Sequence, residues 1–428
     1  MKNRGDIYDR LLYIAVAIFA VLLLAREFVV PSIGGVIVVG IMAILMILLP
    51  YKQCISFLFF VLPLTCGIPG FSMLCSYIII LSKSKNINSW QFIPPICIVL
   101  LELFHVCNYD FVISMPAVFS FSSFILVFYY LIFNCDRRVD IADCIKLFII
   151  GTVFACVTVI LKLTSIVGIE ELMLGTLRGG VLATEEVVIG QFDLNANSMA
   201  FYSIVSFTCL LIGSKILRMP SIAHTVLLTL SVIVGLLSFS RTYIMLLALA
   251  VLLYLVSNRH SMKVIIAGLI LTCVLVYVAP LFFESLLDVF TERFSDENAT
   301  SAGGRTEIFM IYHNAFLDNP RLYIGGTGVV HYSNVIGYHM SMHCGFQQLY
   351  VCCGIIGLVV YFVSALHYKR RFVTKGLPST FYIPLIVCFI FSQSIQFLNP
   401  YFLMLPFIPV VYILRLKIFT YENIGINS

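Results

Sequence analysis

Apolar runs that recur along almost the whole chain are the feature that most limits what this sequence can fold into. Residues 141–163 and 346–366 are two of them, and each is long enough to cross the bilayer core, which takes about 20 residues of α-helix. A helix is favoured in lipid because it satisfies its own backbone hydrogen-bonding groups. Of the 428 residues, 61% are hydrophobic and only 11% are charged. We therefore predict an all-α fold, a multi-pass transmembrane helical bundle.

Charged and turn residues divide these runs into about fourteen predicted spans. The spans lie near residues 11–25, 33–49, 54–66, 68–82, 92–107, 115–134, 141–163, 196–214, 222–238, 242–257, 263–283, 346–366, 379–396 and 401–416. The pair at 54–82 is interrupted by Pro63, Gly67, Pro69 and Gly70, and we interpret it as a shallow hairpin.

The distribution of lysine and arginine predicts the orientation of the chain. Short cytoplasmic loops carry the positive charge of membrane proteins. If 54–82 is a hairpin, the basic clusters all fall on the face of the N-terminus, so we expect both termini in the cytoplasm. The net charge of +5 then reports orientation, and no nucleic-acid partner is expected.

This topology leaves two long connections on the outer face. It divides the chain into N-terminal transmembrane helices, a first outer loop, central transmembrane helices, a second outer loop and C-terminal transmembrane helices. Their ranges are 1–163, 164–195, 196–283, 284–345 and 346–428. The second outer loop contains an apolar stripe at helical spacing, which the sequence Asp318-Asn319-Pro320 ends. We expect short amphipathic helices there, lying at the headgroups.

Arginines on the outer face are candidates for binding an anion. Arg241 lies in a turn of a few residues between two spans, and Arg178 lies beside Gly179 and Gly180 in the first outer loop. A guanidinium pairs with phosphate through two hydrogen bonds and stays charged in a partly dry site. The alternatives are a helix-end anchor for Arg241 and a plain turn around Arg178.

Histidines also gather in the second outer loop. His339 and His343 stand four residues apart, which is compatible with a metal site, but no HExxH pattern or acidic ligand accompanies them. His343 stands where a span begins, and an imidazole titrates near neutral pH. This position suits a general base that acts on a membrane-borne substrate. The alternative is a histidine that lies at the membrane interface without a catalytic role.

Four motifs resemble the bacterial O-antigen ligase and polymerase family (Wzy/WaaL-like). One is His343-Cys344 followed after nine residues by Gly354 and then by Gly357; the others are SFSRTYIMLLALAV, GGRTEIFMIYHNAFLDNPRLYIGGTG and RGGVLATEEVVIGQFDLNANSMA. The resemblance covers about residues 170–366, in the family's order. Cys344 stands where the family usually has Asn, Ser or Gln, so the partner that orients His343 is left open.

The resemblance implies a GT-C-like enzyme that needs no metal or other cofactor. Such an enzyme transfers a glycan with inversion from undecaprenyl pyrophosphate, on the periplasmic or extracellular face of the bacterial cytoplasmic (inner) membrane. The expected partners are the undecaprenyl-pyrophosphate-linked donor and acceptor and the membrane lipid, with a chain-length regulator and a flippase alongside. The implied roles are catalysis by His343, pyrophosphate binding by Arg178, Arg241 and Arg305, and substrate binding by Asn195 and His339.

Three functions fit these observations. We favour a polymerase that joins repeat units into O-antigen or capsular polysaccharide. A ligase that transfers the finished glycan to lipid A core or another acceptor shares every motif. A polysaccharide flippase or other transporter would use ionisable groups within the membrane, for which Glu102 is a candidate.

Overall fold

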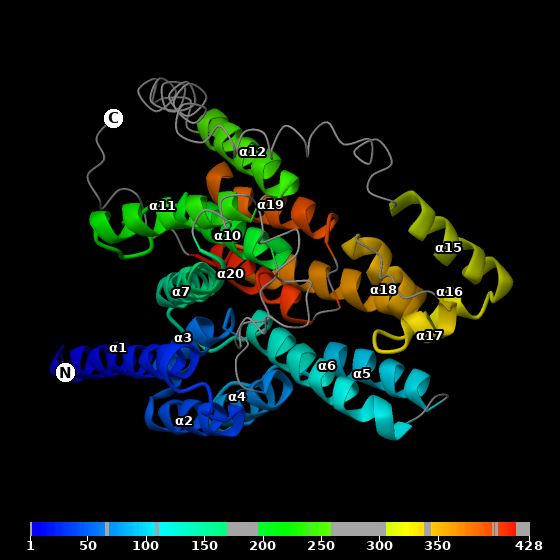
Figure 1. Ribbon diagram of the computed structural model, residues 1–428, viewed down its shortest axis with the longest axis horizontal. Coiled ribbons are helices and arrows are strands. Elements are labelled where there is room, and N and C mark those ends of the chain that lie inside the picture. The colour runs from blue at the N-terminus through cyan, green and yellow to red at the C-terminus, as the bar shows by residue number, and fades with distance from the viewer. Residues whose placement is uncertain are drawn as a thin grey trace.

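The computed structural model describes residues 2–64, 68–107, 111–168, 196–238, 240–257, 305–337, 344–395, 398 and 401–416. These residues form helices and the connections between them, and none of them lies in a β-strand. The helices gather into one bundle, with α15, α16 and α17 at one edge of it (Figure 1). The predicted all-α fold is confirmed for the described residues.

The helices follow the apolar runs closely. Their bounds are α1 Lys2–Leu24, η1 Ala25–Val29, α2 Gly35–Leu48, α3 Tyr51–Val61, α4 Pro69–Lys83, η2 Ser89–Gln91, α5 Ile93–Val106, α6 Phe111–Ile132, α7 Ile141–Val167, α10 Ala196–Leu210, α11 Ser221–Leu237, α12 Arg241–Ser257, α15 Arg305–Asp318, α16 Leu322–Gly325, α17 Tyr332–Ile336, α18 Gly345–Phe372, η5 Ser379–Tyr382, α19 Ile383–Ser392, η6 Tyr401–Met404 and α20 Phe407–Ile413.

Five stretches of the described chain are long and apolar enough to cross a membrane. They are Ile7–Val29, Ser89–Val106, Ser114–Ile132, Ile141–Ile166 and Gly345–Phe372. Shorter apolar helices occupy most of the other predicted spans, and the span at 263–283 lies outside the described residues. The total of about fourteen spans, their sidedness and the five-part division of the chain stay predictions.

The interrupted region at 54–82 forms two short helices, α3 and α4, and α4 begins at Pro69. Every residue of α3 from Gln53 to Val61 is buried. Gly151 of α7 lies against it so closely that a Cβ there would be 2.3 Å from the Phe60 carbonyl oxygen. A helix of 11 residues is too short to cross the bilayer alone, and α3 instead packs inside the protein.

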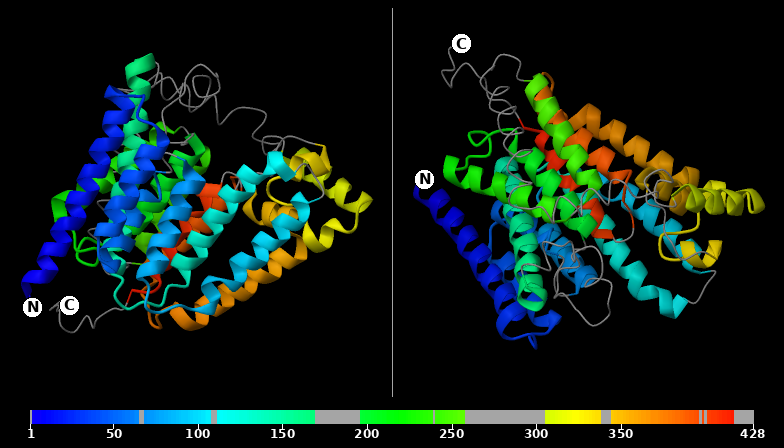
Figure 2. Two further views of the ribbon diagram at one scale, coloured as in Figure 1. Left: turned by 90° about the horizontal axis from the view of Figure 1, so that it is seen from below. Right: turned by 45° about the horizontal axis from the view of Figure 1, so that its top comes forward.

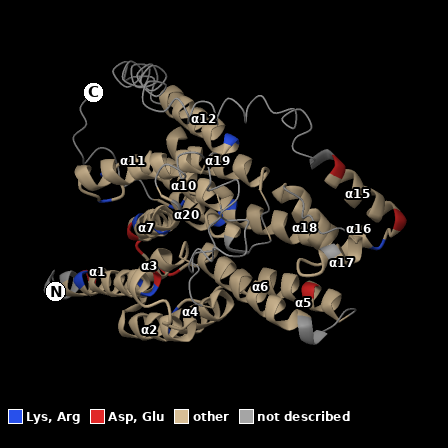
Figure 3. Cartoon of the chain, in the orientation of Figure 1, with Lys and Arg blue, Asp and Glu red and all other residues tan. Residues whose placement is uncertain are grey.

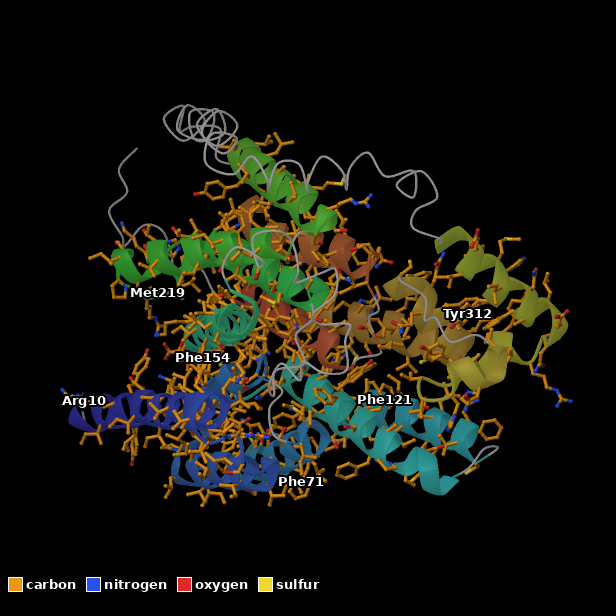
Figure 4. All side chains as sticks on the ribbon, viewed as in Figure 1. Arg10, Phe71, Phe121, Phe154, Met219 and Tyr312 are labelled. Carbon is orange, nitrogen blue, oxygen red and sulfur yellow. The ribbon has the colours of Figure 1, made fainter. Side chains whose placement is uncertain are left out.

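Apolar side chains form one large core and one small core. The large core runs through the bundle and includes Phe121 of α6, with Phe154 of α7 packed against it (Figure 4). The small core lies under α15 and contains Tyr312. Charged residues lie mainly at helix ends and connections, and the bundle is otherwise largely uncharged (Figure 3).

A polar network links the turn between α6 and α7 to α3. Asp136 accepts hydrogen bonds from Arg138 through the Nε atom, at 2.9 Å, and through the backbone N–H, at 3.0 Å. Asn134 accepts from the Asp136 N–H and donates to the Tyr51 hydroxyl at 2.9 Å. The side-chain hydrogen bond from Arg138 is the main reason that the pKa of Asp136 lies below its usual value.

This network predicts a stability that depends on pH. Because the pKa of Asp136 is lower in the folded protein, its contribution is present above the unfolded value, about 3.9, and is lost as the pH falls through the folded value. We expect Asp136→Asn to lower the free energy of unfolding by about 1 to 3 kcal/mol at pH 7, with a smaller difference below about pH 4. Thermal unfolding in detergent across this range measures it. If the difference in stability between Asp136→Asn and wild type stays constant with pH, the lowered pKa of Asp136 does not stabilise the fold.

Candidate active site

Two of the predicted site residues lie on described helices. Arg241 is the first residue of α12, and Arg305 is the first residue of α15. The remaining predicted residues lie outside the described residues: Arg178, Asn195, His339 and His343. Within the described part of the chain, no group of three or more His, Cys, Asp or Glu side chains is arranged to hold a metal ion. The convergence of the arginines and His343 therefore stays a prediction.

A short turn holds Arg241 at the start of α12. The Ser240 hydroxyl accepts a hydrogen bond from the Tyr243 N–H at 3.4 Å, as an N-cap does. The Tyr243 hydroxyl donates to the Ser231 carbonyl at 3.0 Å, which ties α12 back to α11. Arg241 is half-buried, and no carboxylate among the described residues forms an ion pair with it. A guanidinium at the positive end of a helix is suited to binding an anion.

The amphipathic helix predicted after Arg305 is confirmed as α15, which ends at Asp318 as expected. Ile308, Tyr312 and Phe316 are buried in the small core, where they pack with residues of α16, α17 and α18. The opposite face is largely exposed and carries Phe309, 40% exposed. α15 thus carries Arg305 on a helix that is fixed along one side.

The glycine-rich loop after α16 packs directly on α18. The Thr327 N–H donates to the Val351 carbonyl and the Gly328 N–H donates to the Cys352 carbonyl, both at 2.9 Å. Within α18, Gly354 has non-helical backbone angles, φ 60° and ψ −159°. Because this kink interrupts the helical hydrogen-bond ladder, carbonyls one turn before it can accept from the loop.

Both glycines of the motif after His343 have a steric reason. A Cβ on Gly354 would lie 2.4 Å from the Ile324 carbonyl oxygen, and a Cβ on Gly357 would lie 2.1 Å from the Cys353 Cβ. The first glycine lets the loop reach the kinked helix, and the second lets the helix resume beyond the kink.

Gln393 lies beside the start of α18, where the sequence predicted no partner. Its side-chain oxygen accepts a hydrogen bond from the Phe346 N–H at 3.2 Å and lies 3.4 Å from the Cys344 Sγ. Cys344 is the N-cap residue of α18. Cys344, where the resemblance leads us to expect Asn, Ser or Gln, thus contacts an amide from the end of α19. Gln393 stands 49 residues from Cys344, and no local pattern links them.

His331, in the connection between α16 and α17, is buried. The Asn334 amide donates to its Nδ1 at 3.0 Å, so the Nε2 carries the proton and donates to the Ser114 hydroxyl of α6. The hydrogen bond to Ser114 connects the start of α17 to α6, and the hydrogen bond from Asn334 orients the imidazole for it. The sequence indicated the histidine, but its partner on a distant helix appears only in the fold.

Comparison with known proteins finds a family model that matches part of the chain. Residues 226–362 match the family model described as O-antigen ligase. This range contains Arg241, Arg305, His339 and His343, whereas Arg178 and Asn195 lie before it. No curated protein matches the chain, and no solved structure matches it.

Proposed function

We propose that this protein, whose residues 226–362 carry the domain of the O-antigen ligase and polymerase family, is a glycosyltransferase that polymerises lipid-linked oligosaccharide repeat units. The donor would be linked to undecaprenyl pyrophosphate, and the product would be O-antigen or capsular polysaccharide. The family match carries this proposal, because it includes two of the three arginines and His343. The apolar helices and the family suggest an inner membrane protein.

In the proposed reaction, His343 accepts the proton of an acceptor sugar hydroxyl. The hydroxyl oxygen attacks the anomeric carbon of the donor, and the bond from that carbon to the pyrophosphate oxygen breaks with inversion. Negative charge develops on the leaving pyrophosphate, where Arg178, Arg241 and Arg305 would stabilise it. Asn195 and His339 would bind the substrates. The reaction would take place on the outer face of the membrane, between the loops 164–195 and 284–345.

The described geometry supports this mechanism in two ways. Arg241 and Arg305 are each the first residue of a helix, and the N-terminal end of a helix carries partial positive charge. The loop that leads toward His343 is fixed on its N-terminal side by α18, and α18 itself begins just after His343. Transfer from a lipid pyrophosphate requires cations that bind the pyrophosphate and a base within reach of the acceptor hydroxyl.

The ligase is the second candidate, because the matching family is described by that activity. The two enzymes differ in their acceptor, so the glycans of a deletion strain distinguish them. A single repeat unit attached to the acceptor indicates a polymerase. Undecaprenyl-linked polymer that never reaches its acceptor indicates a ligase.

A transporter has less support. The membrane acid that the sequence offered for transport, Glu102, accepts hydrogen bonds from the Val329 and Val330 N–H groups at 2.7 and 2.9 Å. It is 2% exposed. A carboxylate held by two backbone groups in this way is built into the structure of the outer loop rather than left to bind and release a cargo.

Removal of a pyrophosphate-binding arginine is expected to impair donor use. We expect Arg241→Ala and Arg305→Ala each to lower kcat/KM for the lipid-linked donor by about 100-fold, as loss of one charge-stabilising group commonly does. Lysine at either position should restore part of the activity, because it keeps the charge but not the two-bond geometry. Transfer assays with purified protein and defined donor measure this.

Arg321 provides a matched control. It is an exposed arginine between α15 and α16, so Arg321→Ala removes the same charge from the same region. The kcat/KM of this variant for the donor should stay within about twofold of wild type. Equal losses for all three arginine variants would show a general effect of charge and would refute specific pyrophosphate binding.

A further inference from the structure

We infer that Glu102 and His105 are positioning residues for the proposed active site. They hold the outer loop 325–331, from which the chain continues toward His343. This inference rests on the proposed function, because it concerns the same site. Both residues belong to α5, which lies outside the matched range 226–362. The N-terminal half of the protein would therefore contribute directly to the geometry of the active site.

The carboxylate of Glu102 binds the C-terminal part of the loop. Its Oε2 accepts from the Val329 N–H at 2.7 Å, and its Oε1 accepts from the Val330 N–H at 2.9 Å. Two successive backbone donors are thus satisfied by the two oxygens of one side chain. Because the side chain is 2% exposed, water cannot replace either hydrogen bond.

His105 binds the N-terminal end of the same loop. Its Nε2 lies 2.9 Å from the Gly325 carbonyl oxygen, which only accepts, so the imidazole donates. Residues 102 and 105 stand one helical turn apart and project from one face of α5. One face of one helix therefore holds the loop at both ends.

The loop approaches α5 closely because Gly328 has no side chain. Gly328 has φ +79°, and a Cβ there would lie 3.1 Å from the His105 Cβ and 3.2 Å from the Glu102 Oε1. On its other side the loop is bonded to the α18 carbonyls of Val351 and Cys352. The loop is thus enclosed between α5 and α18, which themselves pack against each other (Figure 2).

This enclosure fixes the loop 325–331, which precedes His343 in the chain. Gly337 is the last described residue before His339 and His343, and Cys344 resumes the described chain at the start of α18. A general base must stay within hydrogen-bond reach of its substrate, and a displacement of about 1 Å can cost about 100-fold in rate. Release of the loop from α5 should therefore reduce the chemical step more than donor binding.

The test uses Glu102→Gln in the full-length protein, in detergent or nanodiscs. Glutamine keeps the shape of the side chain, but its amide nitrogen presents a donor to one of the two N–H groups. Hydrogen exchange of a peptide that covers residues 325–331 should become at least about 10-fold faster. The kcat of transfer should fall by about 10-fold to 100-fold, with the donor KM within about twofold of wild type.

Glu27→Gln is the matched control, because it also removes a buried carboxylate. Glu27 is 4% exposed and lies 3.8 Å from the Lys162 Nζ, away from the outer loop. This variant should leave both the exchange of 325–331 and the kcat unchanged.

Several outcomes would overturn the inference. Faster exchange with an unchanged kcat would mean that Glu102 holds the loop without serving catalysis. A lower kcat with unchanged exchange would mean that the carboxylate acts in some other way. The proposed function is tested separately: if His343→Ala retains full transfer, that function is wrong. If transfer is lost in His343→Ala but kept in Glu102→Gln, only the role of Glu102 is refuted.

Discussion

A His343→Ala variant is expected to make no detectable polymer in a strain that lacks the wild-type gene. Loss of a general base costs about 10²-fold to 10⁴-fold in rate, because the acceptor hydroxyl then attacks with its proton still in place. The amount of protein in the membrane should not change, since one histidine next to a long apolar helix contributes little to insertion. Glycan profiles of the complemented strain, with immunoblots of its membranes, measure both quantities.

His313→Ala is the control for this experiment. His313 is exposed on α15, where its ring stacks on Phe309 with the ring centroids 5.9 Å apart. It belongs to the same predicted outer loop but has no role in the proposed reaction, so this variant should restore polymer of normal length. Full-length polymer from the His343 variant would mean that another group accepts the proton.

Features that depend on neighbouring residues were predicted well from the sequence. The stripe after Arg305 and the stop at Asp318 define α15 because burial on one face repeats with the helical period. The break near Pro69 follows from the geometry of proline, which favours the first turn of a helix.

Hydropathy did not distinguish apolar helices that face lipid from those that face the protein interior. The sequence predicted an ordinary membrane span at α10 and half of a shallow hairpin at α3, yet nearly all residues of both helices are buried within the protein. Lipid tails and protein interiors are both apolar, so the same residue types suit either environment. The number of spans consequently could not be fixed by counting apolar runs.

Contacts between distant segments left no pattern in the sequence. Glu102 and Val329 stand 227 residues apart, and the hydrogen bond between them depends on how α5 and α18 pack. Gln393 reaches Cys344 in the same way, from the end of α19. Such partners can be identified only once the helices are arranged in space.

Gly354→Ala is expected to cause the largest loss of stability among substitutions in the loop and α18. The new Cβ would lie 2.4 Å from the Ile324 carbonyl oxygen and 2.7 Å from the Gly326 nitrogen, and backbone atoms cannot move aside as side chains do. The backbone angles, φ 60° and ψ −159°, belong to a region that is essentially restricted to glycine. Strain and overlap each cost about 1 to 3 kcal/mol, so we expect a loss of about 2 to 6 kcal/mol.

Thermal unfolding in detergent measures the total loss, and Gly376→Ala separates its two causes. Gly376 also has a positive φ, +75°, but a Cβ there would meet nothing within 4 Å, so this variant should lose only about 1 kcal/mol. Gly40→Ala, within α2 and equally open, should be neutral or slightly stabilising. Because the overlap at Gly354 is with the segment that opens the loop, hydrogen exchange of residues 325–331 should rise in Gly354→Ala alone. If Gly354→Ala instead unfolds like Gly376→Ala and its loop stays protected, the kink in α18 does not depend on close contact with the loop.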